Sequence, residues 1–221
     1  MNLNKIVIEK DLWYIDNFLT QEEIDWIMSE ANKESGWYIT MQSPYGNIGN
    51  KYLQIKQEDE NGNVLLPTEP GAEFRPIPYF YGEGGILERI ESVMPEGTRA
   101  APTLQSFLSR VDDSKGLYDD ADFALDWHYE NYRWENLADN DPKDVRLKAS
   151  YSLYINNNFD GGDLIFKYKD YVIKPMPGRF VNIPITKEFT HKVTKVTNGD
   201  RHTLYGSCWE GTFPESTREN C

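Results

Sequence analysis

The chain has 221 residues, of which 39% are hydrophobic, 14% aromatic and 27% charged, a composition that suits one globular domain with a sizeable core. Its 36 acidic and 23 basic side chains give a formal net charge of -13, which opposes binding to nucleic acids and to anionic membrane surfaces. The two cysteines cannot form a disulfide framework, and no long apolar run predicts a membrane helix or a secretory signal. We therefore expect a cytoplasmic protein.

A short extended run at 6–8 opens the chain, and a helix entry signal follows it. Thr20 stands three residues before Glu23, which is the spacing of a capping box. Apolar side chains then recur at helical spacing as far as Asn32. This pattern predicts the first helix, packed on the outside of a sheet.

Loop signals dominate the next segment. Glycine, proline and polar residues are frequent from 36 to 82, which predicts loops and one hairpin. A second helix is predicted over 85–93, because its apolar residues form one stripe before Pro95 ends it.

Beyond Pro102 the pattern changes to short segments rich in β-branched and aromatic residues, separated by turn signals such as Asp160-Gly161-Gly162. The expected strands are 104–111, 123–132, 147–156, 163–166, 171–174, 180–183, 191–196 and 201–209. They predict an antiparallel sandwich or barrel with helices only at its front. We expect one domain, 1–221, with a helical and loop support region at 1–100 and a β core at 101–212.

The chain has three histidines, so any histidine-based metal site must draw on His128, His191 and His202. On a β-strand, His128 and Glu130 share one face. Two imidazoles and a carboxylate make a facial triad for iron(II), and the natural third ligand is His191, with His202 as the weaker choice. An acid two residues after a histidine is common by chance in so acidic a chain, so this pair carries little weight alone.

Arg201 adds weight because it follows His191 by ten residues and can clamp a carboxylate with paired charge-assisted hydrogen bonds. On its strand, Thr203 shares the face of Arg201, and His202 shares the opposite face with Leu204. If Arg201 points inward, this alternation argues against His202 as a ligand. The alternative is a surface arginine that closes a hairpin.

The order of these features resembles the prolyl 4-hydroxylase-like branch of the 2-oxoglutarate and iron(II)-dependent dioxygenases. The stretches that carry the resemblance are 15–23, 128–130, 152–156, 159–166, 174–181, 191–193 and 199–201. The resemblance implies a mainly β fold with flanking N-terminal helices, namely a double-stranded β-helix, or jelly roll.

The resemblance also implies roles for individual residues. The implied iron ligands are His128, Glu130 and His191. Arg201 would bind the distal carboxylate of 2-oxoglutarate, and Tyr154 would assist it, unless Tyr154 is simply an aromatic that fills the barrel. Thr203 stands where the family often has a hydroxyl.

Two departures from the family pattern are visible. Glu130 replaces the usual aspartate, which adds a methylene between backbone and metal. A long insertion precedes His128, which suggests an unusual substrate pocket. Since Glu130 keeps the carboxylate that halogenating relatives lack, the resemblance implies hydroxylation.

The implied cofactors are iron(II), the co-substrate 2-oxoglutarate and O2, with ascorbate as a stimulant and with succinate and CO2 as products. The expected substrate is a peptide or protein, prolyl residues included, or an amino acid. Aromatic loops around Trp37, Tyr45 and Tyr79 to Tyr81 suit a basic or proline-rich peptide, or else serve loop packing. The acidic residues in the predicted loops have two interpretations as well: they form a solvated face, or they attract a cationic substrate. The alternative functions are a non-catalytic jelly-roll binding module and a 2-oxoglutarate-independent cupin metalloenzyme.

Overall fold

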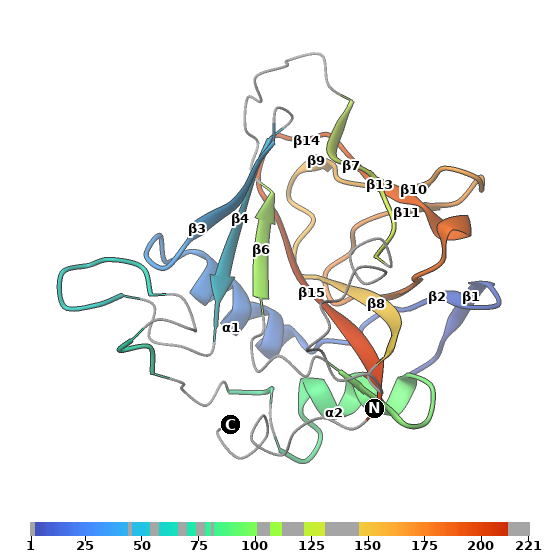
Figure 1. Cartoon of the computed structure of the whole chain (residues 1–221), viewed down its shortest axis with the longest axis horizontal. Helices are drawn as coiled ribbons and strands as arrows, with labels where there is room; N and C mark the ends of the chain where they lie inside the picture. Colours follow the sequence, from blue (N-terminus) through green and yellow to red (C-terminus); the bar gives the residue numbers. More distant parts are fainter. Residues whose placement is uncertain are drawn as a thin grey trace, which may run out of the picture.

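Two antiparallel sheets form most of the protein, as the computed structural model in Figure 1 shows. The structure describes residues 3–43, 46–53, 58–65, 70–73, 78–80, 82–100, 107–111, 122–130 and 146–211. Every strand pair in it is antiparallel. The mainly β, jelly-roll fold class that the sequence predicted is therefore confirmed.

The large sheet runs across the molecule from the N-terminal strands to a hairpin. In spatial order its strands are β1 (Ile6–Glu9), β2 (Leu12–Ile15), β12 (Phe180–Pro184), β8 (Arg146–Tyr154), β15 (Arg201–Glu210), β6 (Phe107–Val111), β4 (Gly46–Tyr52) and β3 (Tyr38–Ser43), with β5 (Thr98–Ala100) paired to β15. Strands from both ends of the sequence thus meet in one sheet.

The small sheet packs over one face of the large sheet. Its order is β11 (Val172–Ile173), β10 (Leu164–Phe166), β13 (His191–Thr194) and β7 (Phe123–His128), and a separate pair joins β14 (Val196–Thr197) to β9 (Asp160–Gly161). A buried cluster fills the space between the sheets. It combines Tyr154 and Val181 of the large sheet with Leu164 and Val193 of the small sheet.

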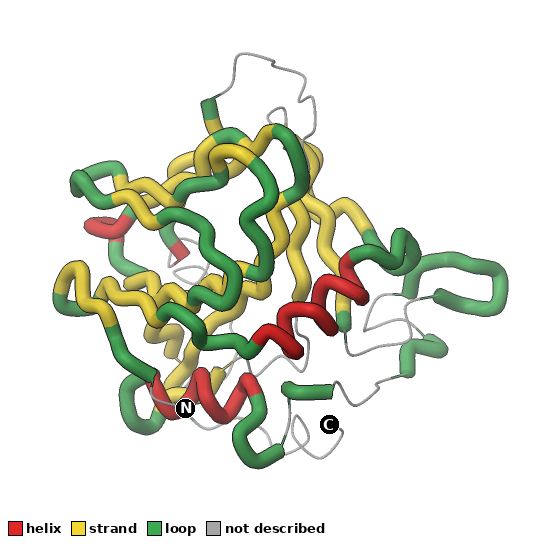
Figure 2. Tube along the Cα trace, turned by 180° about the vertical axis from the view of Figure 1, so that it is seen from behind, coloured by secondary structure: helices red, strands yellow, loops and turns green. Residues whose placement is uncertain are grey.

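Two helices cover the outer face of the large sheet, away from the small sheet (Figures 1 and 2). They are α1 (Gln21–Ala31) and α2 (Ile86–Val93). Ile27 and Ile90 of these helices are fully buried against Leu153 and Leu204 of the sheet. Since side chains alternate along a strand, β8 and β15 turn one set of residues to the helices and the next set to the space between the sheets.

Local signals explain how α1 is held. The Thr20 hydroxyl accepts from the Glu23 amide at 3.2 Å, and the Glu23 carboxylate accepts from the Thr20 amide at 2.8 Å, so the predicted capping box is confirmed. At the other end, the buried Lys51 ammonium of β4 donates to the carbonyls of Glu30, Lys33 and Ser35 at 2.7–2.8 Å. A cation there complements the helix dipole and ties the hairpin to the helix.

The structure also corrects several predicted boundaries. The strand predicted over 123–132 ends at His128, and its last two residues lie outside the described part of the chain. The segment before residue 100 contributes β1 to β4 to the large sheet, so it is more than the predicted helices and loops. The hairpin predicted within 36–82 is β3–β4. The domain boundary at residue 100 stays a prediction.

The described part of the chain contains no helix long and apolar enough to cross a membrane.

Candidate functional site

His128 and His191 face each other across neighbouring strands of the small sheet. The residues are direct partners in the β7–β13 register, and directly opposed residues of antiparallel strands project their side chains to the same face. Their ring centroids lie 4.4 Å apart at an interplanar angle of 63°. His191 is 3% exposed, whereas His128 is half-buried. The sheet itself therefore brings two imidazoles together.

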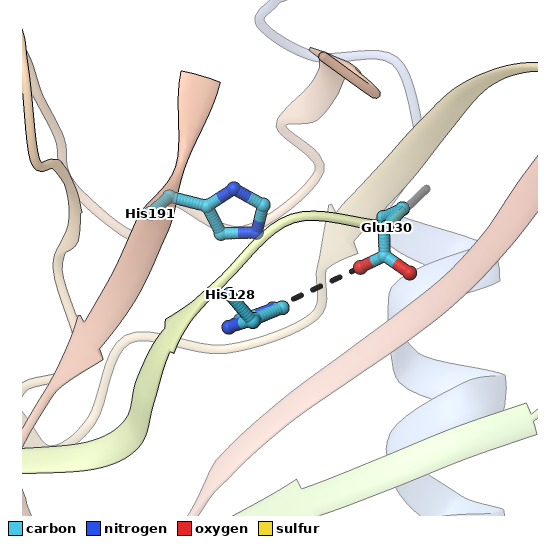
Figure 3. Close-up of side chains that lie close together, drawn as sticks. All are labelled: His128, Glu130 and His191. Atoms are coloured by element: carbon cyan, nitrogen blue, oxygen red, sulfur yellow. Dashed lines mark ion pairs between the residues drawn. The ribbon is translucent and has the colours of Figure 1, made fainter. Parts of the chain in front are cut away.

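Glu130 joins them from beyond the end of β7. The predicted mechanism, in which a continuous strand turns His128 and Glu130 to one face, is wrong, because the strand stops at His128. The chain bends after this residue, and Glu130 Oε1 nevertheless lies 3.8 Å from His128 Nε2 (Figure 3). One ligand atom from each of Glu130, His128 and His191 lies within 4.8 Å of the others. The structure thus brings the predicted triad together by a turn.

Backbone carbonyls fix the orientation of both imidazoles. His128 Nδ1 lies 2.6 Å from the Asp126 carbonyl oxygen, and His191 Nδ1 lies 2.9 Å from the Phe189 carbonyl oxygen. A carbonyl can only accept, so each Nδ1 carries the proton in the neutral ring. Each Nε2 then keeps its lone pair, which is the arrangement of a metal-ligating histidine with an outer hydrogen bond.

Electrostatics also favour the neutral state of His191. Burial lowers the pKa of His191 from 6.5 to about 3, and the nearby His128 lowers it further, against the opposing effect of the Phe189 carbonyl. At neutral pH, His191 is therefore an uncharged donor. Two neutral imidazoles and one carboxylate on one side of a metal are the donor set of non-haem iron(II) oxygenases, so these residues fit iron(II).

Arg201 and Tyr154 form a second group of polar atoms without partners. Arg201 begins β15 and is 5% exposed, and Tyr154 ends β8 and is fully buried. The Arg201 guanidinium carbon lies 5.0 Å from the Tyr154 ring centroid. Among the described residues, neither Arg201 Nε nor the Tyr154 hydroxyl has a hydrogen-bond partner. Buried polar groups are costly without partners, so the pair fits a ligand carboxylate such as the distal end of 2-oxoglutarate.

Thr203 and His202 lie on opposite sides of β15, as the predicted alternation requires. Thr203 is 3% exposed and opposes Tyr154 in the β8–β15 register, which puts the two side chains on one face. The His202 ring lies 6.0 Å from the Trp37 ring on the helix side, and burial lowers the pKa of His202 to about 4. His202 is not among the gathered candidate ligands.

Sequence reasoning missed the role of Gly162. Its φ is +69°, and a Cβ there would lie 2.9 Å from Arg201 Cδ and 2.7 Å from Phe159. A glycine at this position allows the backbone to approach the Arg201 side chain closely. The Asp160-Gly161-Gly162 signal predicted a turn and formed part of the family resemblance, and its second glycine is the signal that could have revealed this contact.

The predicted aromatic loops have partners within the protein where they are described. Trp37 Nε1 donates to the Ala31 carbonyl at 3.2 Å, the Tyr79 hydroxyl donates to Glu22 at 2.7 Å, and Phe80 is buried. These contacts favour the packing interpretation. Tyr45 and Tyr81 lie outside the described residues, as do residues 112–121 of the insertion before His128.

Comparison with known proteins agrees with this arrangement. Residues 117–209 match the 2OG-Fe(II) oxygenase superfamily, and this segment contains every candidate site residue named above. Over this segment the match agrees with the family resemblance noted in the sequence. The cofactors of that family are iron(II), 2-oxoglutarate and O2, as predicted.

Solved structures show the same fold. A viral collagen prolyl hydroxylase from Paramecium bursaria Chlorella virus-1, in complex with 2-oxoglutarate, aligns with a TM-score of 0.53 and 15% identity over 92% of this chain and 97% of its own. An oxidoreductase of the 2OG-Fe(II) oxygenase family from Burkholderia pseudomallei aligns with a TM-score of 0.53 and 12% identity over 87% of this chain and 81% of its own. No curated protein matches the chain significantly.

Proposed function

We propose that this protein is an iron(II)- and 2-oxoglutarate-dependent hydroxylase whose metal ligands are His128, Glu130 and His191. The observation that carries the proposal is the clustering of these side chains, with ligand atoms within 4.8 Å of one another, inside the segment that matches the oxygenase superfamily. With 2-oxoglutarate and O2 bound, such a metal supports oxidative decarboxylation to succinate and CO2 coupled to hydroxylation of a C–H bond.

The protein's own residues orient the reactants. The Asp126 and Phe189 carbonyls hold the imidazoles so that both Nε2 atoms are free to bind metal. Arg201, with Tyr154 and Thr203 beside it, would bind the distal carboxylate of 2-oxoglutarate. Because Arg201 is 5% exposed, water competes weakly for this ion pair, which strengthens it.

Retention of Glu130 supports hydroxylation. A carboxylate in the third ligand position fills the place that a halide would need, so the site favours hydroxyl transfer over halogenation. The non-catalytic binding module has no need of a buried arginine whose Nε lacks a hydrogen-bond partner among the described residues, and the cupin alternative has no third histidine among the gathered residues.

The proposed substrate is a peptidyl residue, prolyl residues included, or a free amino acid. The net charge of -13 favours a basic peptide by long-range attraction, and the collagen prolyl hydroxylase with the same fold supports prolyl peptides as the first to test. The proposed catalytic domain spans 1–221 and acts in the cytoplasm. Ascorbate is a proposed stimulant.

The test is succinate release from 2-oxoglutarate with iron(II), measured against libraries of basic prolyl peptides, other peptides and free amino acids. We expect one class to raise succinate formation together with a mass gain of one oxygen in the substrate. His191→Ala should abolish both signals. Substrate-stimulated succinate without an oxygenated product would refute hydroxylation, and undiminished turnover in His191→Ala would refute the ligand assignment.

A further inference from the structure

The backbone around Arg201 lacks a regular strand neighbour on one side. Arg201 pairs with Val111 of β6, but the ladder between β15 and β8 begins only at Thr203, opposite Tyr154. One further backbone bond, from the Ile155 amide to the His202 carbonyl at 3.1 Å, extends it beyond Thr203. The peptide groups before and after Arg201 on the β8 side therefore need other hydrogen-bond partners, because buried backbone groups are rarely left unpaired.

The Asn156 side chain supplies those partners. Asn156 lies two residues past the end of β8 and is 7% exposed. Its Nδ2 donates to the Asp200 carbonyl at 2.8 Å, and its Oδ1 accepts from the His202 amide at 2.8 Å. A carboxamide carries the same donor and acceptor as a peptide group. Asn156 thus continues the β8 ladder with its side chain and holds the residues on both sides of Arg201.

Arg201 depends on this support because little else fixes its guanidinium. Its Nε has no hydrogen-bond partner among the described residues, and it has no ion pair within that part of the chain. Its side chain packs against the Tyr154 ring and the Gly162 backbone. These contacts restrict the space open to the side chain, but they do not fix the direction in which its N–H groups point. The direction of the guanidinium is therefore set mainly by the backbone from Asp200 to His202.

We propose that Asn156 is a positioning residue for Arg201, which aligns the guanidinium with the distal carboxylate of 2-oxoglutarate. The proposal rests on the proposed function, since it assigns that ligand to Arg201. A displacement of the backbone at Asp200 and His202 moves the Cα and Cβ atoms of Arg201 and so displaces its guanidinium. Paired hydrogen bonds to a carboxylate tolerate little misalignment. Asn156 has no contact with the triad among its hydrogen bonds, so metal binding should not depend on it.

The experiment compares two oxo acids that differ only at the distal end. Calorimetric titrations add 2-oxoglutarate, or 2-oxopentanoate with a methyl in place of the distal carboxylate, to manganese(II)-loaded enzyme. In Asn156→Ala we expect 2-oxoglutarate to bind roughly tenfold more weakly, the equivalent of one lost hydrogen bond. Binding of 2-oxopentanoate and of manganese(II) should change by less than about twofold, the usual limit for independent sites.

Three further variants separate positioning from a structural role. Asn182 of β12 is 5% exposed and donates to the Asp11 carbonyl at 2.7 Å, so Asn182→Ala removes a buried amide that holds no neighbour of Arg201. It should leave 2-oxoglutarate affinity unchanged. In an Arg201→Met background, Asn156→Ala should have no additional effect on 2-oxoglutarate. If Asn156→Ala folds poorly, Asn156→Ser keeps a hydroxyl for one of the two bonds and should give an intermediate loss.

The outcomes are distinguishable. Equal weakening of both oxo acids, full additivity with Arg201→Met, or unchanged 2-oxoglutarate affinity in Asn156→Ala and Asn156→Ser would overturn the role of Asn156. In each of these cases, the proposed function stays intact if the wild type binds 2-oxoglutarate and Arg201→Met weakens that binding by at least about 100-fold. A wild-type protein that binds manganese(II) but no 2-oxoglutarate would instead overturn the proposed function.

Discussion

Replacement of Arg201 by methionine should separate ligand binding from stability. Arg201 is 5% exposed, and its Nε is without a hydrogen-bond partner among the described residues. An unsatisfied buried polar group costs about 1–3 kcal/mol, and the contact with the Tyr154 ring at 5.0 Å returns about 1–2 kcal/mol. These opposing effects nearly cancel. Methionine keeps an apolar stem of similar length. The free energy of unfolding of Arg201→Met should therefore lie within about 1 kcal/mol of the wild-type value.

The loss of 2-oxoglutarate binding should be much larger. Two charge-assisted hydrogen bonds from Arg201 to the distal carboxylate contribute about 1.5–3 kcal/mol each, so their removal weakens binding by at least about 100-fold. Urea unfolding without 2-oxoglutarate gives the stability, and calorimetric titration of the manganese(II)-loaded protein gives the affinity.

Arg179 provides a matched control. It is also buried, at 8% exposed, but it pairs with both carboxylate oxygens of Asp16 at 2.6 and 3.1 Å. Arg179→Met leaves that carboxylate unpaired, so it should destabilise the protein by about 2–3 kcal/mol, because the pair is only partly buried. It should not alter 2-oxoglutarate affinity. If Arg201→Met instead behaves like this control, with a large loss of stability and unchanged affinity for 2-oxoglutarate, Arg201 does not bind the distal carboxylate.

Two further predictions follow from the site and the fold. Glu130→Asp shortens the side chain by about 1.5 Å, which is more than metal–ligand distances tolerate. The affinity for manganese(II), measured by calorimetry, should therefore fall. Equal or tighter binding would contradict the assignment of Glu130 as a metal ligand. The metal-free protein should lose stability as the pH falls from 6.5 towards 4, because the pKa of His202 is about 4 when folded and 6.5 when unfolded, so the unfolded state binds more protons in this window. His202→Gln should reduce the slope of stability against pH by up to about 1.4 kcal/mol per pH unit, and an unchanged slope would show that His202 does not contribute.

The parts of the fold that depend on local signals were predictable from the sequence. The capping box at Thr20 and the apolar stripes of the two helices are local, and the turn signals separated most strands of the small sheet. The β3–β4 hairpin was predicted without strand bounds, because the segment Gly46–Tyr52 has little strand character of its own and is held by pairing with β6. Neighbouring strands thus override weak local preference.

The candidate site was predictable in its residues but not in its geometry. The direct pairing of His191 with His128 depends on a register with bulges between β7 and β13, which no local pattern encodes. Glu130 joins the site past the strand end, contrary to the predicted alternation. The lack of a hydrogen-bond partner for Arg201 Nε among the described residues depends on the three-dimensional neighbours of β15, which no local pattern encodes.

The visible spectrum of the anaerobic iron(II)-loaded protein on addition of 2-oxoglutarate tests the iron-site assignment most directly. We expect a weak charge-transfer band in the wild type, because the oxo acid would bind iron held by His128, Glu130 and His191. The band should be lost in His191→Ala and should require far more 2-oxoglutarate in Arg201→Met. A wild-type protein that shows no band, or an undiminished band in His191→Ala, would contradict the assignment.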